Sequence, residues 1–397
     1  MLAPRILLLS STLLLALGQH AFAQAVDGEA FAERVQATFA ATGFPMEYTG
    51  VRDENGAVVI EGVSFGEGAE ATPVGDARFE NVTGSDAEGW ASERGTFDDF
   101  QVSEEATVTR IEGLAVEGLS IRPGTEGASQ ALAIQTPSGE TLNAWFDRLV
   151  LTSMRVERDG EETFALQDLD VANEMASATD ISFDMSVGSF SLATGADGEE
   201  PSVPEEIGYE RFAGTMSASG AWNMETGDLS LSPLQIAVDD AGEMNFAYRV
   251  SGYTPQFIAQ LSALQQQMAA DPEGGAGAMA MIGLLSQLTI HSAELRFVDE
   301  SLTNRLLDHY AEENGQTREA LIDQLVGSLP NVLAALNNPQ FQTEVTEAVD
   351  AFLRDPQSIT ASIAPDQPVP AAQIMGAAMG APQTLPAVLS LTVRSND

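Results

Sequence analysis

The sequence predicts an α+β fold: a large, curled and mostly antiparallel β-sheet of repetitive strands, with an N-terminal helix and a C-terminal helical block. From Phe44 to about Gly252, apolar and polar residues alternate with a period of two, and the connections are rich in Gly, Asp and Asn. Helical periodicity is confined to the two flanking regions. Because strands do not alternate with helices, the pattern argues against a parallel α/β sheet.

Residues 1–23 have the features of a cleavable signal peptide. Arg5 gives a basic start, Ile6–Leu17 is a mostly apolar stretch, and Ala21 and Ala23 form an A-x-A cleavage site. The apolar stretch is shorter than the about 20 residues that span a bilayer. We therefore predict cleavage after Ala23 and export to a bacterial periplasm, with no transmembrane span in the mature chain. The chain has no cysteine, which excludes disulfides and a lipid anchor on an N-terminal Cys.

The formal net charge of the chain is −42, and all 17 of its basic residues are Arg. Nucleic acid is excluded as an expected partner, because its binding depends on Lys and Arg that neutralise phosphates. Direct docking on an anionic membrane surface is disfavoured for the same reason. An adaptation to saline surroundings explains the same composition without any partner.

The first predicted element is a helix over Asp27–Gly43, in which Phe31, Val35 and Phe39 share one face. Gly43 is a natural C-terminal stop. Strands follow, and the sequences Asp53-Glu54-Asn55-Gly56 and Asp159-Gly160 mark tight hairpins between them.

The later part of the predicted sheet contains two irregularities. Thr194–Ile207 is polar and acidic and contains two prolines, so it reads as a surface loop or linker. In the strand Asp228–Asp239 the apolar parity changes at Ser232-Pro233. Since Pro lacks a donor for the ladder, this strand has either a bulge at that point or an edge position.

From Thr254 the composition becomes helical, so we divide the mature chain into residues 24–253, an N-terminal helix with repetitive strands, and residues 254–397, a helical region with closing strands. The predicted helices are Thr254–Ala270, Ala278–Leu285, Asp299–Gly315, Thr317–Leu329 and Pro339–Arg354. The predicted closing strands are Leu288–Val298, Ser358–Ala364 and Val388–Ser395, the last two enclosing a helical turn at Pro370–Met379.

Few residues of the mature chain are suited to chemistry. His291 and His309 are its two histidines, and no G-x-S-x-G elbow accompanies them. The clusters Asp53-Glu54, Asp98-Asp99 and Asp239-Asp240 lack the spacing of a calcium loop, and turn chemistry explains them. We assign no catalytic residue, no metal site and no cofactor, and leave calcium binding open.

The apolar parity of the strands is the main indication of function. A sheet with one apolar face must fold on itself, accept the helical block as a lid, or curl around a lipid. The residues that we expect to line such a groove, the last three from a covering helix, are Leu229, Leu231, Met244, Phe246, Tyr248, Phe257, Leu261 and Leu264.

Several segments resemble the repetitive strands of AsmA-like envelope proteins. The segments are IEGLAVEGLSI (Ile111–Ile121), FDRLVLTSMRVERDG (Phe146–Gly160), FALQDLDV (Phe164–Val171) and METGDLSLSPLQIAVDDAGEMNF (Met224–Phe246). The resemblance covers about Ala57–Tyr253 and implies a long, U-shaped periplasmic β groove that holds or moves phospholipid. This chain departs from that family in its cleavable signal peptide and its C-terminal helical block.

The expected function is therefore non-enzymatic binding of a lipid or another apolar envelope component in a β groove. Phospholipid, acyl chains and envelope proteins are the candidate partners. The alternative is a structural or protein-interaction module of the envelope that has a closed core and no ligand.

Overall fold

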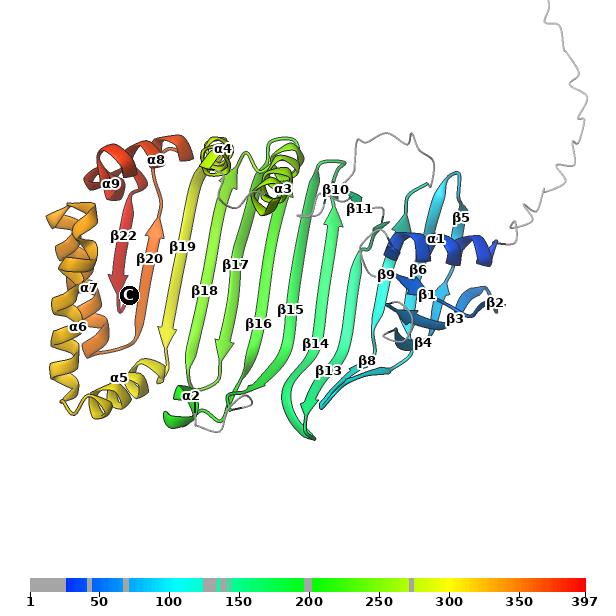
Figure 1. Ribbon diagram of the computed structural model, residues 1–397, viewed down its shortest axis with the longest axis horizontal. Helices are drawn as coiled ribbons and strands as arrows, with labels where there is room; N and C mark the ends of the chain where they lie inside the picture. Colours follow the sequence, from blue (N-terminus) through cyan, green and yellow to red (C-terminus); the bar gives the residue numbers. More distant parts are fainter. Residues whose placement is uncertain are drawn as a thin grey trace, which may run out of the picture.

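The computed structural model describes residues 26–40, 45–66, 71–123, 134–135, 141–142, 144–195, 202–270 and 275–397. An open antiparallel sheet of 20 strands dominates it, with a helix at the N-terminal side and a helical block at the C-terminal side (Figure 1). This confirms the predicted fold class. The predicted signal peptide at residues 1–23 lies outside the described residues.

The N-terminal part is compact, because helix α1 covers a group of short strands. Phe31 of α1 is fully buried and its ring meets the rings of Phe79 and Trp90 at centroid distances of 5.2 and 5.7 Å. Val35 is buried one turn later, as its spacing predicted. The elements are α1 (Gly28–Ala40), β1 (Met46–Glu47), β2 (Gly50–Glu54), β3 (Ala57–Phe65), β4 (Thr72–Glu80), β5 (Thr83–Ser85), β6 (Gly89–Phe97), β7 (Phe100–Glu104), β8 (Thr107–Glu112) and β9 (Ala115–Ile121).

The long strands form the middle of the molecule and are hydrogen-bonded in chain order from β13 to β20. Strand β13 also pairs with β8 and β9, which joins them to the N-terminal part. The strands are β12 (Ala144–Trp145), β13 (Arg148–Arg158), β14 (Glu161–Met175), β15 (Asp180–Ala193), β16 (Arg211–Asn223), β17 (Asp228–Val238), β18 (Gly242–Ser251), β19 (Thr289–Asp299), β20 (Ser358–Ile363), β21 (Val369–Pro370) and β22 (Leu391–Ser395). Strands β10 (Ile134–Gln135) and β11 (Thr141–Leu142) form a separate pair.

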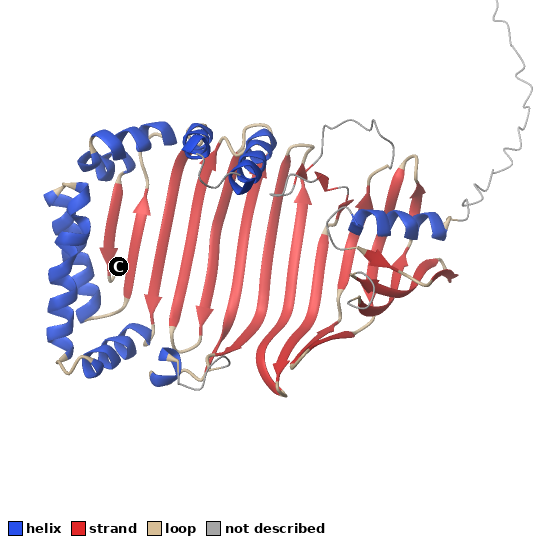
Figure 2. Ribbon diagram, in the orientation of Figure 1, coloured by secondary structure: helices blue, strands red, loops and turns tan. Residues whose placement is uncertain are grey.

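The remaining helices lie around the margin of the long sheet (Figure 2). Helices α3, α4, α8 and α9 lie where β16 and β18 end, whereas α2 and α5 lie at the opposite strand ends. Helix α7 packs against the edge strand β22. The helices are α2 (Val203–Glu206), α3 (Pro255–Ala270), α4 (Gly275–Leu285), α5 (Leu302–Glu313), α6 (Arg318–Val332), η3 (Leu333–Leu336), α7 (Pro339–Arg354), α8 (Ala371–Gly380), η4 (Pro382–Thr384) and α9 (Leu385–Leu389).

Several boundaries differ from the prediction. Helix α4 begins at Gly275 rather than Ala278, and the predicted loop Thr194–Ile207 contains the short helix α2. Helix α6 continues through Pro330 to Val332, whereas the prediction ended it at Leu329; a proline this close to a helix C-terminus costs one hydrogen bond of the last turn. Val388 lies in α9 rather than in the final strand. Helix α5 begins at Leu302 with Ser301 at the N-cap position, whereas the predicted helix began at Asp299; Asp299 accepts a hydrogen bond from the Thr303 amide at 2.7 Å.

Within the described part of the chain, no helix combines the length and the apolar character needed to cross a membrane.

Candidate functional site

The long sheet has one apolar face, which is continuous from β13 to the edge strand. Residues opposite each other in register lie on the same face, so the pairings trace rows of side chains across the strands. One such row is Leu149, Val171, Met185, Ala218, Leu234, Phe246, Leu295, Ala361 and Val393. The row beside it is Leu151, Leu169, Val187, Met216, Ile236, Met244, Phe297 and Ile359.

Two further apolar rows lie toward the strand ends near α3. They are Phe183, Gly220, Leu231, Tyr248, Ala293, Ile363 and Leu391, and then Met175, Ile181, Trp222, Leu229, Val250, Ile290 and Val369. At a strand spacing of about 4.8 Å and about 3.3 Å per residue, the four rows cover an area of about 38 by 20 Å.

The opposite face of the same strands is polar. A row on that face reads Val150, Asp170, Ser186, Ser217, Gln235, Asn245, Arg296 and Thr360. Arg148 forms a bidentate ion pair with Asp170, and hydrogen bonding from the guanidinium lowers the pKa of that carboxyl. The sheet is therefore a strongly amphipathic single layer.

No described helix or strand forms a second layer over the middle of the apolar face (Figures 1 and 2). Leu192, Leu295 and Met244 on this face are 47 %, 47 % and 38 % exposed, whereas side chains of this kind are usually buried. Helix α7 covers the margin at β20 and β22, and its Phe352 ring contacts that of Phe297 on β19 at 6.4 Å. The face is thus a contiguous apolar surface, of the kind that marks an interaction site.

Five of the predicted groove residues lie on this face, as neighbours on two strands. Leu231 pairs directly with Tyr248, and the rings of Phe246 and Tyr248 are 5.6 Å apart. Burial in this apolar setting raises the pKa of the Tyr248 hydroxyl. Leu229 and Met244 extend the same face along β17 and β18.

The phase change predicted in β17 is a bulge. The register shifts between Leu231 and Leu234, and the strand is hydrogen-bonded to neighbours on both sides, so it is not an edge strand. The bulge at Ser232-Pro233 keeps the leucines before and after it on one face, because both pair with residues of one face of β18.

The other three predicted residues, Phe257, Leu261 and Leu264, do not lie over that face. Phe257 and Leu264 are buried between α3 and α4, where they pack with Leu284, and Leu261 lies against the same cluster. The hairpin α3–α4 contacts the end of the apolar face through Tyr253, whose ring lies between those of Trp222 and Phe257.

On the sheet itself, the predicted groove residues lie only on β17 and β18, although the apolar face extends over many more strands. Its most exposed members include Leu192 of β15 and Leu295 of β19. The alternation in Ile181–Leu192 and Leu288–Val298 predicted these strands, and the same parity argument would have found Leu295. Leu192 has the opposite parity to Ile181 and Val187, and only the register shift after Val187 brings it to the same face.

The two histidines are not members of the apolar rows. The Nε2 atom of His291 is 2.9 Å from the hydroxyl of Ser251 at the end of β18. A hydrolytic triad also requires a carboxylate on the other ring nitrogen and an oxyanion hole; among the described residues no carboxylate is hydrogen-bonded to His291. His309 Nε2 lies 3.3 Å from a carboxylate oxygen of Glu206, and this contact links α5 to α2. The His309 ring also packs against the ring of Tyr310, its neighbour on α5.

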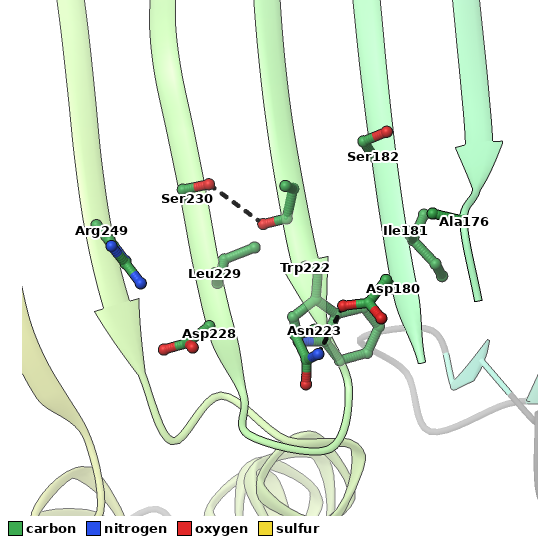
Figure 3. Close-up of a pocket in the computed structure, with 11 residues that line it drawn as sticks. Ala176, Asp180, Ile181, Ser182, Trp222, Asn223, Asp228, Leu229, Ser230 and Arg249 are labelled. Carbon is green, nitrogen blue, oxygen red and sulfur yellow. Dashed lines mark hydrogen bonds between the residues drawn. The ribbon is translucent and has the colours of Figure 1, made fainter. Parts of the chain in front are cut away.

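A cavity of about 330 Å³ lies at the ends of β15 to β18 (Figure 3). Most of its lining residues belong to the polar face, and Ile181, Trp222 and Leu229 belong to an apolar row. Asp180 accepts hydrogen bonds from Ser177 and Asn223 at 2.5 and 2.6 Å, and the bond from Ser177 contributes most to lowering the pKa of this carboxyl. No group of three or more His, Cys, Asp or Glu in the described part of the chain is arranged to hold a metal ion. The lining consists of Ala176, Asp180, Ile181, Ser182, Ala221, Trp222, Asn223, Asp228, Leu229, Ser230 and Arg249.

A comparison with protein families finds a match over residues 235–396, to a family described as "Uncharacterized protein". The matched region runs from the second half of β17 to the last strand. A comparison with curated proteins finds no match.

Proposed function

We propose that this protein is a non-enzymatic, exported protein that binds the acyl chains of phospholipid, or of another apolar envelope component, on the apolar face of its long sheet. The single observation that carries the proposal is the run of apolar rows across β13 to β19, over the middle of which no described helix or strand lies. Exposed apolar surface on this scale is unfavourable in water, and a ligand that covers it gains about 25 cal/mol for each Å² removed from water.

The shape of the face favours an elongated ligand over a compact one. The apolar residues form rows, and the cavity described above is lined mostly by residues of the polar face. An acyl chain can lie along such a row and contribute about 0.8 kcal/mol for each buried CH₂ group. The proposal agrees with the resemblance to AsmA-like envelope proteins and extends it to specific strands.

The alternative, a module with a closed core and no ligand, is less well supported. A closed core buries its large apolar side chains, as the N-terminal part does with Phe31 and Phe79, both of which are at most 2 % exposed. The long sheet instead leaves Leu192 and Leu295 about half exposed.

The proposal is tested by purifying the full chain without detergent from cells that export it, followed by native mass spectrometry and lipid extraction. We expect phospholipid or fatty acid to copurify at a defined stoichiometry. A chain that carries no lipid, and that also fails to bind a fluorescent fatty acid added afterwards, would refute lipid binding and leave a protein partner for this face.

A further inference from the structure

The two ends of the long strands differ sharply in charge. The helical segments where β16, β18 and β20 end contain no Asp, Glu, Arg or His; they are α3, α4, η3, α8, η4 and α9. We call this set the uncharged end. At the opposite strand ends, α2 has the sequence VPEE and α5 has the sequence LTNRLLDHYAEE. We call that side the acidic end.

The absence of charge in these segments is not a property of the chain as a whole, in which charged residues make up 19 %. Every other described α-helix carries at least two charged residues. Charged residues do occur at the same strand ends, in the strands (Asp180, Asp228) and in the connections (Glu225, Asp366), but none lies in these helical segments.

The uncharged end, together with the last residue of α6 next to η3, also carries the most exposed apolar side chains. Among the large hydrophobic residues that the structure describes, the three with the greatest exposure are Met379 of α8 at 84 %, Val332 at the end of α6 at 71 %, and Met279 of α4 at 69 %. Ile282 of α4 is 42 % exposed on the same short helix. A solvated surface gains nothing from such side chains, so their concentration at one end points to a contact.

These residues come from separate segments that the fold brings to one edge (Figure 1). The amide of Asn338, beside η3, donates a hydrogen bond to the Gln383 carbonyl of η4 at 2.9 Å. Helices α3 and α4 are joined by their shared core. The exposed side chains of α4, α6 and α8 therefore lie along one margin of the sheet and can meet an extended surface together.

We propose that the uncharged end rests in the interfacial layer of a lipid bilayer, with the acidic end directed away from it. Neutral apolar side chains such as Met279 and Met379 can enter the boundary between headgroups and acyl chains without desolvating a charge. A bilayer fits this margin better than a second copy of the chain, because two copies that each carry a formal charge of −42 repel one another.

The negative charge of the chain does not prevent this contact, because the acidic end lies far from the membrane surface. Strand β14 has 15 residues and therefore spans about 50 Å. This is several times the Debye length of about 8 Å at physiological ionic strength, so the carboxylates of the acidic end are screened from the membrane surface. Membrane docking by the uncharged end does not require lipid binding by the apolar face. The two surfaces are nevertheless adjacent, because the apolar row that contains Trp222 and Leu229 reaches the strand ends at the uncharged end.

The full chain lacks cysteine, so single cysteines can carry an environment-sensitive fluorophore without a background signal. We would label Met279→Cys and Met379→Cys at the uncharged end. The matched control is Val203→Cys on α2 at the acidic end, which is also exposed, at 37 %. Each labelled protein is mixed with vesicles of phosphatidylcholine, and with vesicles that also contain phosphatidylglycerol.

We expect the two labels at the uncharged end to shift to shorter emission wavelengths with phosphatidylcholine vesicles, and the Val203 label to remain unchanged. Equal shifts at all three positions, or none at either methionine, would overturn the proposal. A dimer that forms without vesicles and buries both methionine labels would overturn it in favour of self-association.

Vesicle flotation of unlabelled variants gives the second readout. The double variant Met279→Asp, Met379→Asp should float with phosphatidylcholine vesicles about tenfold less than the parent protein. The variant Met244→Asp, on the apolar face, should float like the parent even if it no longer binds fatty acid. The two variants therefore test membrane docking and lipid binding by the sheet separately. Thermal unfolding curves establish that each variant is folded.

Discussion

Replacement of Leu295 by Asp is the sharpest test of the apolar face. Leu295 lies in the middle of β19, between Phe246 on one neighbouring strand and Ala361 on the other, and it is 47 % exposed. Burying a whole leucine side chain is worth about 1.5–3 kcal/mol, so a ligand that covers the exposed half gains about 1 kcal/mol from it. The variant Leu295→Ala should lose this binding free energy of about 1 kcal/mol, which corresponds to about a fivefold weaker affinity for the ligand.

The aspartate variant should lose considerably more, because a bound acyl chain would also have to desolvate a carboxylate. An unpaired polar group costs about 1–3 kcal/mol when it is buried, and a charge costs more, so we expect Leu295→Asp to bind at least about thirtyfold more weakly. The unbound protein should tolerate the change, since the position already faces water. The assay is a titration with a fluorescent fatty acid, with thermal unfolding measured in parallel.

The matched control lies on the same strand and points to the other face. Ser292 is exposed on the polar face, where it pairs with Arg249 of β18. The variant Ser292→Asp adds the same charge without touching the apolar rows, and should leave fatty-acid affinity unchanged. If both aspartate variants weaken binding equally, or if Leu295→Asp binds as well as the parent, the ligand does not lie on the apolar face.

Three further predictions concern stability. A Cβ atom on Gly220 would lie 2.5 Å from the Phe183 ring, so Gly220→Val should lower the free energy of unfolding by about 1–3 kcal/mol in chemical denaturation. Phe31→Ala should cost about 3–5 kcal/mol by the same assay because it empties the N-terminal core, yet it should leave fatty-acid affinity intact. A hydrogen bond from Arg148 lowers the pKa of Asp170 in the folded protein. This carboxyl therefore stabilises the fold above its unfolded pKa, and the stabilisation is lost as the pH falls through its folded pKa. In Asp170→Asn, the free energy of unfolding should fall less steeply as the pH is lowered through that range.

The fold class could be predicted because the strands of the long sheet follow a local rule. Period-two alternation depends only on which face of a strand is buried and which is solvated, so it can be recognised in each strand without knowing its neighbours. Even the irregularity at Ser232-Pro233 was readable, because Pro interrupts the ladder and the parity of the leucines changes around it. The helix N-terminus at Pro339 was also predicted at the observed residue, and in the structure Asn338 caps it by accepting a hydrogen bond from the Phe341 amide.

The placement of the helical block could not be predicted, because it depends on contacts between distant elements. Phe257, Leu261 and Leu264 form an apolar stripe on α3 whatever that stripe packs against. In the structure the partner is Leu284 of α4, a helix that is apolar all round and so gives no directional signal of its own. This pairing leaves the sheet open, because the apolar residues of α3 already pack against α4 and so cannot pack over the strands.

An open apolar face raises the question of what keeps two copies of this protein apart, and the charge of the chain answers it. Stacked sheets pack about 10 Å apart, and at low salt two chains with a formal charge of −42 each repel at that distance. At about 1 M salt the Debye length falls to about 3 Å, and the repulsion no longer reaches across the interface. We therefore expect the lipid-free protein to sediment as a monomer at low salt and to associate at high salt. The variant Leu295→Asp should remain monomeric under both conditions, whereas Ser292→Asp should associate like the parent. Association that is unchanged by salt, or that persists in Leu295→Asp, would mean that charge repulsion is not what keeps the apolar faces accessible.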